Sequence, residues 1–118
     1  MKTMLVVDDS AFMRKLIIKS VAELDVTVVA EAENGKIAVE KYVELEPDIV
    51  TLDIAMLEHN GIEALKKIKE HNPDATVIII SSTTDQDIIA DDVMALGAHS
   101  IITKPNFKDE LIEAISGL

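Results

Sequence analysis

The chain has 118 residues, 48% of them hydrophobic, a length that suits one domain with its own core. Its 22 acidic residues outnumber 11 basic ones, and the formal net charge of −11 opposes binding to nucleic acid or to an anionic membrane surface. There is no cysteine, which excludes disulfides and thiolate chemistry. The expected partners are a basic protein surface or a divalent cation, unless the charge serves solubility alone.

No part of the sequence resembles a targeting or membrane segment. The N-terminal apolar run reaches Asp8 too soon for a signal peptide, and no run approaches the roughly 18 apolar residues of a membrane span. We therefore expect a soluble, cytoplasmic protein, and nothing in the sequence suggests an obligate dimer, so a monomer is expected.

Five short apolar runs alternate with five stretches of helical periodicity. The predicted strands are residues 4–7, 26–32, 49–53, 76–80 and 100–103. Ser10 is placed to cap the first helix, and Gly97 to close the fourth, predicted over residues 85–96. The fifth helix is predicted over residues 108–115. The apolar stripes of the first, third and fifth helices are Met13, Ile17, Val21 and Leu24; Ile62, Leu65 and Ile68; and Leu111, Ile112, Ile115 and Leu118.

This alternation predicts the fold class. Strands that are continuously apolar indicate a parallel sheet covered by helices on both faces, and right-handed crossovers leave few topologies. We predict an α/β domain over residues 1–118, a doubly wound, flavodoxin-like (βα)5 fold with a five-stranded parallel sheet in the order 2-1-3-4-5. Five units are too few for an eightfold barrel.

Polar residues follow four of the predicted strands. Asp8 and Asp9 follow the first strand, Asp53 ends the third, Ser81 follows the fourth and Lys104 follows the fifth. The carboxyl ends of parallel strands share one sheet edge, where ligands bind at the point of reversed strand order. These five side chains are therefore expected to lie together.

Three carboxylates at one point need either a cation or shifted pKa values. Two charges about 4 Å apart repel by about 4 kcal/mol at an effective dielectric near 20. Oxygen ligands without His or Cys favour a hard cation, Mg²⁺ above Zn²⁺. An ammonium at Lys104 and a hydroxyl at Ser81 would suit a phosphoryl group attached to Asp53, which makes Asp53 a candidate nucleophile.

Each of these residues also has an ordinary structural interpretation. Asp8-Asp9 could serve helix capping, Asp53 a turn, Ser81 a bond to its own backbone, and Lys104 only the surface. The functional interpretation depends on all of them sharing one edge.

The same residues belong to a set of short motifs that spans nearly the whole chain. The motifs are Leu5-Val6-Val7-Asp8-Asp9-Ser10, Ala32 to Gly35, Pro47-Asp48 leading to Asp53, Met56, Asn60-Gly61, Gly97-Ala98 and Lys104-Pro105. Together they resemble the response-regulator receiver domain, and most of all the single-domain chemotaxis regulators of the CheY type. Residues 9–14 and 81–84 are also similar to the receiver half of chemotaxis methylesterases.

The resemblance implies a phospho-accepting switch rather than an enzyme, although one that assists its own phosphorylation and dephosphorylation. Asp53 would accept a phosphoryl group from a CheA-like histidine kinase. Asp9, Asp53 and the main-chain carbonyl of Ala55 would ligate Mg²⁺, with Asp8 acting mostly through water. Lys104 would contact the phosphoryl oxygens, and the Lys104-Pro105 peptide would be cis.

The resemblance also implies an output route. Ser81 would move towards the phosphoryl group and carry the signal to the face of helix four, strand five and helix five. A motor switch protein or a motility adaptor would read that face. A phosphate sink or relay intermediate in another two-component pathway is the alternative. The acidic face of helix four, with Asp85, Asp87, Asp91 and Asp92, is either solvated or meets a basic target.

Several residues depart from the family pattern. Leu57 replaces a common proline, His59 a common Met, and Ala55 has no side chain to orient a hydrolytic water. Ile101 stands where many members carry an aromatic switch residue. Counting from Asp53 or from Lys104 gives Ser81 or Ser82 as the switch hydroxyl, and we prefer Ser81.

Two other function classes share this type of sheet. A flavin carrier should have a phosphate loop of Ser, Thr and Gly after the first strand, where this chain has two aspartates. A hydrolase with an aspartate nucleophile usually carries Asp-x-Asp there, which is not present. Both fit the sequence less well.

Overall fold

The computed structural model describes residues 2–53, 60–81, 93–103 and 107–118. Its strands are β1 (Lys2–Val7), β2 (Val26–Ala32), β3 (Ile49–Asp53), β4 (Thr76–Ser81) and β5 (Ser100–Thr103). Its helices are α1 (Ala11–Ser20), α2 (Gly35–Leu45), α3 (Asn60–His71) and α5 (Phe107–Ser116). Most of the predicted fourth helix lies outside the described residues; positions 93–95 of it are helical.

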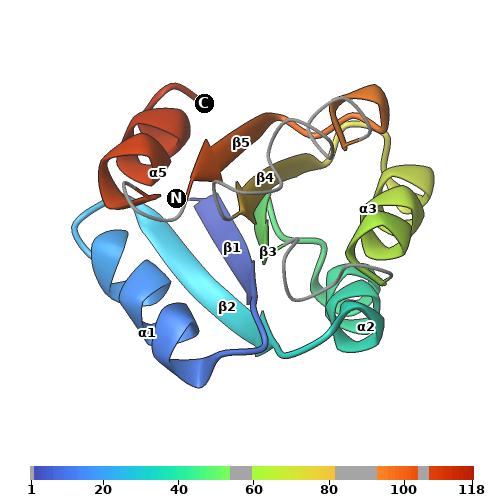
Figure 1. Ribbon diagram of the computed structural model, residues 1–118, viewed down its shortest axis with the longest axis horizontal. Coiled ribbons are helices and arrows are strands. Elements are labelled where there is room, and N and C mark those ends of the chain that lie inside the picture. The colour runs from blue at the N-terminus through green and yellow to red at the C-terminus, as the bar shows by residue number, and fades with distance from the viewer. Residues whose placement is uncertain (1, 54–59, 82–92, 104–106) are drawn as a thin grey trace.

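The predicted topology is confirmed. The five strands form one sheet in the order β2-β1-β3-β4-β5, and every neighbouring pair is parallel. Helices α1 and α5 cover one face of the sheet, and α2 and α3 cover the other (Figure 1). The order reverses between β1 and β3, so the carboxyl ends of these two strands border the position where ligands bind in such sheets.

A separate apolar core lies on each face of the sheet. On the α1 and α5 face, Met4, Val6 and Ile49 pack with Ile17 and Leu111. The cluster on the opposite face is made of buried residues that include Leu5, Val50, Leu52, Leu65, Ile68, Val77 and Ile79. Each buried side chain of this size contributes roughly 1.5–3 kcal/mol. Because both faces of β3 are covered, all five of its residues are buried.

In two places the apolar stripe predicted from the sequence extends beyond the observed end of the helix. Helix α1 ends at Ser20, so Val21 and Leu24 contact the core from the turn beyond it rather than from the helix. Leu118 is 39% exposed, so it does not share the buried side of α5 with Leu111 and Ile115. In both cases the chain has left the helix, and the helical period no longer sets where side chains point.

Strand β2 departs from the expected continuous burial because it is an edge strand. Its residues alternate between partial burial and exposure, and only Ala32 is buried. The pairing with β1 also shifts by one residue, since Met4 pairs with Val28 and Leu5 pairs with Ala30. Val29 is therefore the extra residue of a β-bulge, a feature that changes the face to which the following side chains point.

Gly97 ends the helical segment before β5, as predicted. Its φ is +101°, and the amides of Gly97 and Ala98 donate to the carbonyls of Met94 and Val93 at 3.0 Å each. This is the Schellman pattern. A Cβ at Gly97 would also lie 2.8 Å from Cε of Lys69, whose Nζ donates to the Ala75 carbonyl at 2.9 Å.

We expect Gly97→Ala to lower the free energy of unfolding by about 1–2 kcal/mol, because alanine disfavours this backbone conformation and meets the Lys69 side chain. Urea denaturation measures the loss. Gly117→Ala is the control, since Gly117 lacks a positive φ and its added Cβ would have only ordinary contacts. Equal stability of wild type and Gly97→Ala would contradict this explanation.

Within the described ranges, none of the helices is both long enough and apolar enough to cross a membrane.

Candidate metal and phosphoryl-acceptor site

Two neighbouring strands carry aspartates to the position where the strand order reverses. Asp53 is the last residue of β3, and Asp8 directly follows β1. Val7 pairs with Leu52, so Asp8 and Asp53 occupy adjacent positions on adjoining strands. The alternation along each strand puts both on the face of Val6 and Ile49, which is covered by α1 and α5.

The three predicted carboxylates lie together. Carboxylate oxygens of Asp8, Asp9 and Asp53 are all within 4.8 Å of one another. Asp8 is fully buried, Asp53 is 2% exposed, and Asp9 is exposed. Solvent therefore screens the charges of Asp8 and Asp53 little, whereas the carboxylate of Asp9 faces the solvent. Such a cluster could hold a cation between two buried carboxylates and one that faces the solvent.

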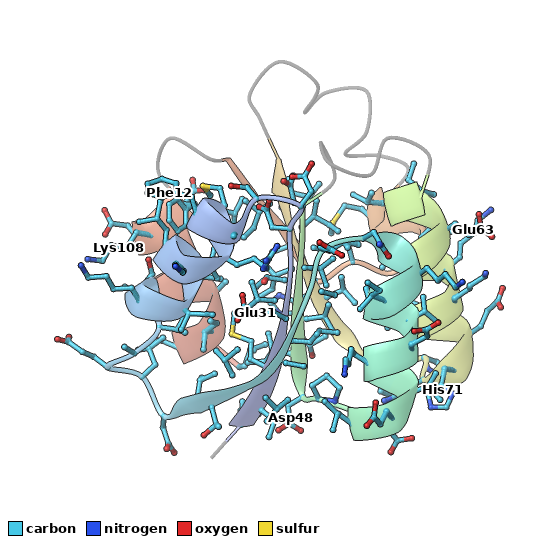
Figure 2. The ribbon with its side chains drawn as sticks, turned by 90° about the horizontal axis from the view of Figure 1, so that it is seen from below. Phe12, Glu31, Asp48, Glu63, His71 and Lys108 are labelled. Carbon is cyan, nitrogen blue, oxygen red and sulfur yellow. The ribbon has the colours of Figure 1, made fainter. Side chains whose placement is uncertain are left out.

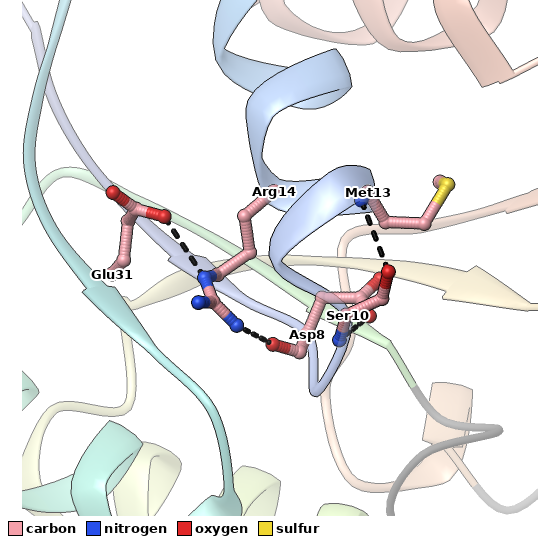
Figure 3. A network of polar contacts seen from close by, with 5 residues as sticks. All are labelled: Asp8, Ser10, Met13, Arg14 and Glu31. Carbon is pink, nitrogen blue, oxygen red and sulfur yellow. Dashed lines mark hydrogen bonds and ion pairs between the residues drawn. The ribbon is translucent and has the colours of Figure 1, made fainter.

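The loop that carries Asp8 and Asp9 is fixed by local hydrogen bonds (Figure 3). The Asp8 amide donates to the Ala32 carbonyl at 3.0 Å, and Oδ1 of Asp8 accepts from the Ser10 amide at 2.9 Å. Oγ of Ser10 accepts from the Met13 amide at 3.2 Å, which confirms Ser10 as the N-cap of α1. A single short segment therefore ends the strand, presents the carboxylates and starts the helix.

Arg14, to which the sequence alone gave no role, contacts this loop, and Glu31 in turn pairs with Arg14. Nη1 of Arg14 donates to the Asp8 carbonyl at 2.6 Å, and Nε of Arg14 lies 2.9 Å from Oε1 of Glu31 on β2. Figure 3 shows the guanidinium bridging α1, β2 and the end of β1. The available signal in the sequence was Glu31, an acidic residue inside an apolar strand. The face of the sheet to which Glu31 points depends on the bulge at Val29, which the sequence does not reveal.

The other predicted site residues are described only partly or not at all. The backbone of Ser81 ends β4, one residue beyond Ile80, which pairs with Asp53, and Ser81 itself pairs with Thr103. Strand β5 thus reaches the same edge just before Lys104. Lys104, the Lys104-Pro105 peptide, Ala55 and the alternative hydroxyl Ser82 lie outside the described residues, as do Leu57 and His59.

The donor set fits a hard divalent cation. Three carboxylates supply oxygen ligands with no nitrogen or sulfur among them, which suits Mg²⁺. Burial of two ligands at the ends of adjoining strands limits their movement, while the exposed Asp9 leaves a route for the ion. The acidic cluster could hold the metal expected from the sequence.

Comparison with known proteins identifies the family. The sequence matches the response regulator receiver domain over residues 4–116. The chain belongs to the receiver-domain family. The receiver domain is 47% identical over 115 residues to chemotaxis protein CheY of Listeria monocytogenes, covering 98% of this chain and 96% of the relative. It is 43% identical to chemotaxis protein CheY of Halobacterium salinarum, covering 98% and 94% of the two chains.

Solved structures agree with the fold of the receiver domain. The response regulator domain of Thermotoga maritima CheB has a TM-score of 0.86 at 40% identity, with 98% of this chain and 94% of that chain covered. A CheX-CheY-BeF3-Mg complex from Borrelia burgdorferi has a TM-score of 0.89 at 31% identity, with 98% and 87% covered. Both resemblances noted in the sequence, to CheY and to the CheB receiver, are thus confirmed.

One departure from the family pattern can be placed in the receiver domain. Ile101 lies on β5, is partly buried and packs against the core on the α2 and α3 face. Its β-branched side chain is held among apolar neighbours on that face. The consequence for output remains a prediction: a rotating aromatic ring cannot operate at this position.

Proposed function

We propose that this receiver domain is a chemotaxis response regulator that accepts a phosphoryl group on Asp53 from a histidine kinase, with Mg²⁺ bound beside it. The observation that carries the proposal is the approach of Asp8, Asp9 and Asp53 to within 4.8 Å at the switch point of the sheet. Three carboxylates placed so closely need a cation, and the transfer of a phosphoryl group needs the same cation.

The chemistry is a phosphoryl transfer from nitrogen to oxygen. A carboxylate oxygen of Asp53 attacks phosphorus, the O–P bond forms, and the P–N bond of a phosphohistidine on the kinase breaks. The electron pair of that bond stays on the imidazole. Asp9, Asp53 and the carbonyl of Ala55 would hold Mg²⁺, with Asp8 acting mostly through water, and the metal would neutralise charge on the phosphoryl oxygens.

Two further residues complete the proposed acceptor site. Lys104 follows β5 and would pair with the phosphoryl oxygens, and the hydroxyl of Ser81 would donate one hydrogen bond. Their strands support these roles, because Thr103 and Ser81 pair at the edge that bears Asp53. The domain then acts as a switch on which the reaction occurs, rather than as an enzyme with an external substrate.

The partners follow from the relatives. A CheA-like kinase supplies the phosphoryl group, and a motor switch protein or motility adaptor reads the face formed by the helix before β5, β5 and α5. The similarity to CheY proteins over 98% of the chain supports a chemotaxis pathway. The Borrelia CheY structure in complex with CheX makes a CheX-like protein a further candidate partner. The domain would work in the cytoplasm, with the kinase.

The proposal is tested by incubating the purified protein with labelled acetyl phosphate, with and without Mg²⁺. We expect one phosphoryl group per chain with Mg²⁺ and a loss of at least about 100-fold in rate after chelation, because the metal neutralises the transferring group. Equal labelling with a chelator present would refute the metal-assisted mechanism. Labelling of this chain by a phosphorylated histidine kinase from a chemotaxis system then tests the donor.

A further inference from the structure

The side chain of Arg14 points towards the loop that carries Asp8 and Asp9 rather than towards solvent. Arg14 lies in the first turns of α1, and only 17% of its side chain is exposed. Nη1 donates to the Asp8 carbonyl at 2.6 Å, and Nε reaches Oε1 of Glu31 at 2.9 Å. One planar guanidinium thus joins the main chain of the loop to a side chain on another strand.

The bulge at Val29 explains why Glu31 is available to Arg14. Before the bulge, Val26 and Val28 pack towards the α1 face; after it, Ala30 and Ala32 pack towards the opposite face. Glu31 pairs with Val6, whose side chain belongs to the α1 face. Without the extra residue, the alternation of β2 would point Glu31 away from α1.

The main chain of Asp8 is hydrogen-bonded at both its amide and its carbonyl. Its amide donates to the Ala32 carbonyl, and its carbonyl accepts from Arg14. Both partners connect Asp8 to β2, because Ala32 belongs to this strand and Arg14 is paired with Glu31 of the same strand. The direction of the next peptide, which leads into Asp9, is therefore set by edge strand β2 as well as by β1.

We infer that Arg14, oriented by Glu31, is a positioning residue for the metal site: it fixes the Asp8 carbonyl and thereby the direction in which Asp8 and Asp9 present their carboxylates. This inference rests on the proposed function, because it assumes that these carboxylates hold Mg²⁺. Groups that orient metal ligands commonly change metal affinity by about 10-fold or more when removed.

The sign of the effect separates positioning from simple electrostatics. Arg14 carries a positive charge close to the cluster, so its charge alone opposes the binding of a cation. Removal of that charge would strengthen Mg²⁺ binding if electrostatics dominated. If Arg14 positions the loop, Arg14→Ala weakens binding instead. Arg14→Lys keeps the charge but has one nitrogen, which cannot make both contacts in the same geometry.

The experiment is a calorimetric titration of MgCl₂ into wild type, Arg14→Ala, Arg14→Lys, Glu31→Gln and the double variant Arg14→Ala/Glu31→Gln. We expect dissociation constants raised about 10-fold by Arg14→Ala, raised also by Arg14→Lys, and raised less by Glu31→Gln. Glu31→Gln should add nothing once Arg14 is absent, because Glu31 acts through Arg14.

Lys67→Ala is the matched control. It removes another cation that pairs with a carboxylate, Oε1 of Glu63 at 3.4 Å, but both side chains are more than half exposed on α3. Mg²⁺ affinity should be unchanged in this variant. Arg14→Lys carries the test if Arg14→Ala does not fold, because it keeps the positive charge, so that electrostatics alone predicts unchanged affinity and loss of positioning predicts weaker binding.

A second readout excludes a role in overall stability alone. The Mg²⁺ concentration for half-maximal phosphorylation should rise about 10-fold in Arg14→Ala, whereas the rate at saturating Mg²⁺ should change little. Wild-type and Arg14→Ala affinities that are equal, or tighter binding in the variant, would overturn the inference while leaving the proposed function intact. Failure of wild type itself to bind Mg²⁺ would overturn both.

Discussion

Replacement of Asp53 by asparagine is expected to abolish phosphorylation by acetyl phosphate or by a phosphorylated histidine kinase. Asparagine has nearly the same shape, but its amide is not a nucleophile towards phosphorus. Asp53 is 2% exposed at the end of a fully buried strand, so the isosteric change should leave the packing of β3 intact. Intact-protein mass spectrometry after incubation with Mg²⁺ and donor measures the fraction of chain that carries the added group.

Asp48→Asn is the control for this variant. Asp48, labelled in Figure 2, is an exposed aspartate directly before the first residue of the same strand, so it lies at the other end of β3 from Asp53. Its Oδ2 accepts from the amide of Thr3 at 2.8 Å, and an asparagine oxygen can do the same. Full labelling of Asp48→Asn with none of Asp53→Asn supports the assignment. Wild-type levels of labelling in Asp53→Asn would disprove it.

Removal of one charge from the acidic cluster is expected to stabilise the protein when no divalent cation is present. At about 4 Å, two charges repel by about 4 kcal/mol at an effective dielectric near 20, and exposure of Asp9 reduces the effect. We therefore expect Asp53→Asn to raise the free energy of unfolding by about 1 kcal/mol in a chelator. Urea denaturation monitored by circular dichroism measures the difference.

Mg²⁺ should reverse this order of stability. Binding to the folded state alone adds about 2.7 kcal/mol when the free ion is at 100 times its dissociation constant. Wild type gains this increment, while Asp53→Asn, which lacks one ligand charge, gains less. Lower stability of Asp53→Asn than of wild type in chelator, or a wild-type unfolding curve that Mg²⁺ leaves unchanged, would contradict a metal-binding acidic cluster. Asp48→Asn should respond to Mg²⁺ as wild type does.

Local sequence signals predicted the elements that frame the site. Strand β3, which ends at Asp53, follows from a short apolar run, since burial on both faces favours apolar and β-branched residues along a strand. Ser10 was identified as a cap because its hydroxyl can accept from the amide of Met13, three residues along the chain. The topology then brought Asp8, Asp9 and Asp53 together without further information.

The remaining features depend on contacts between distant parts of the chain. The bulge at Val29 exists only in the pairing of β2 with β1, and the contact of Arg14 with Glu31 follows from that bulge. The end of α1 at Ser20 is similar, because Leu24 continues the helical period yet reaches the core from a turn. Sequence periodicity cannot distinguish a helix that continues to Leu24 from one that ends in a turn before it, since either arrangement places Leu24 against the same core.

The central claim is that the phosphoryl group resides on Asp53, and chemical mapping of the modified residue tests it most directly. The protein is phosphorylated with Mg²⁺ and donor, reduced with borohydride, digested and sequenced by mass spectrometry. An acyl phosphate on Asp53 is reduced to an alcohol, so the account predicts homoserine at position 53 and unmodified aspartate at Asp8, Asp9 and Asp48. Modification of a histidine, a serine or another aspartate, with Asp53 unchanged, would contradict it.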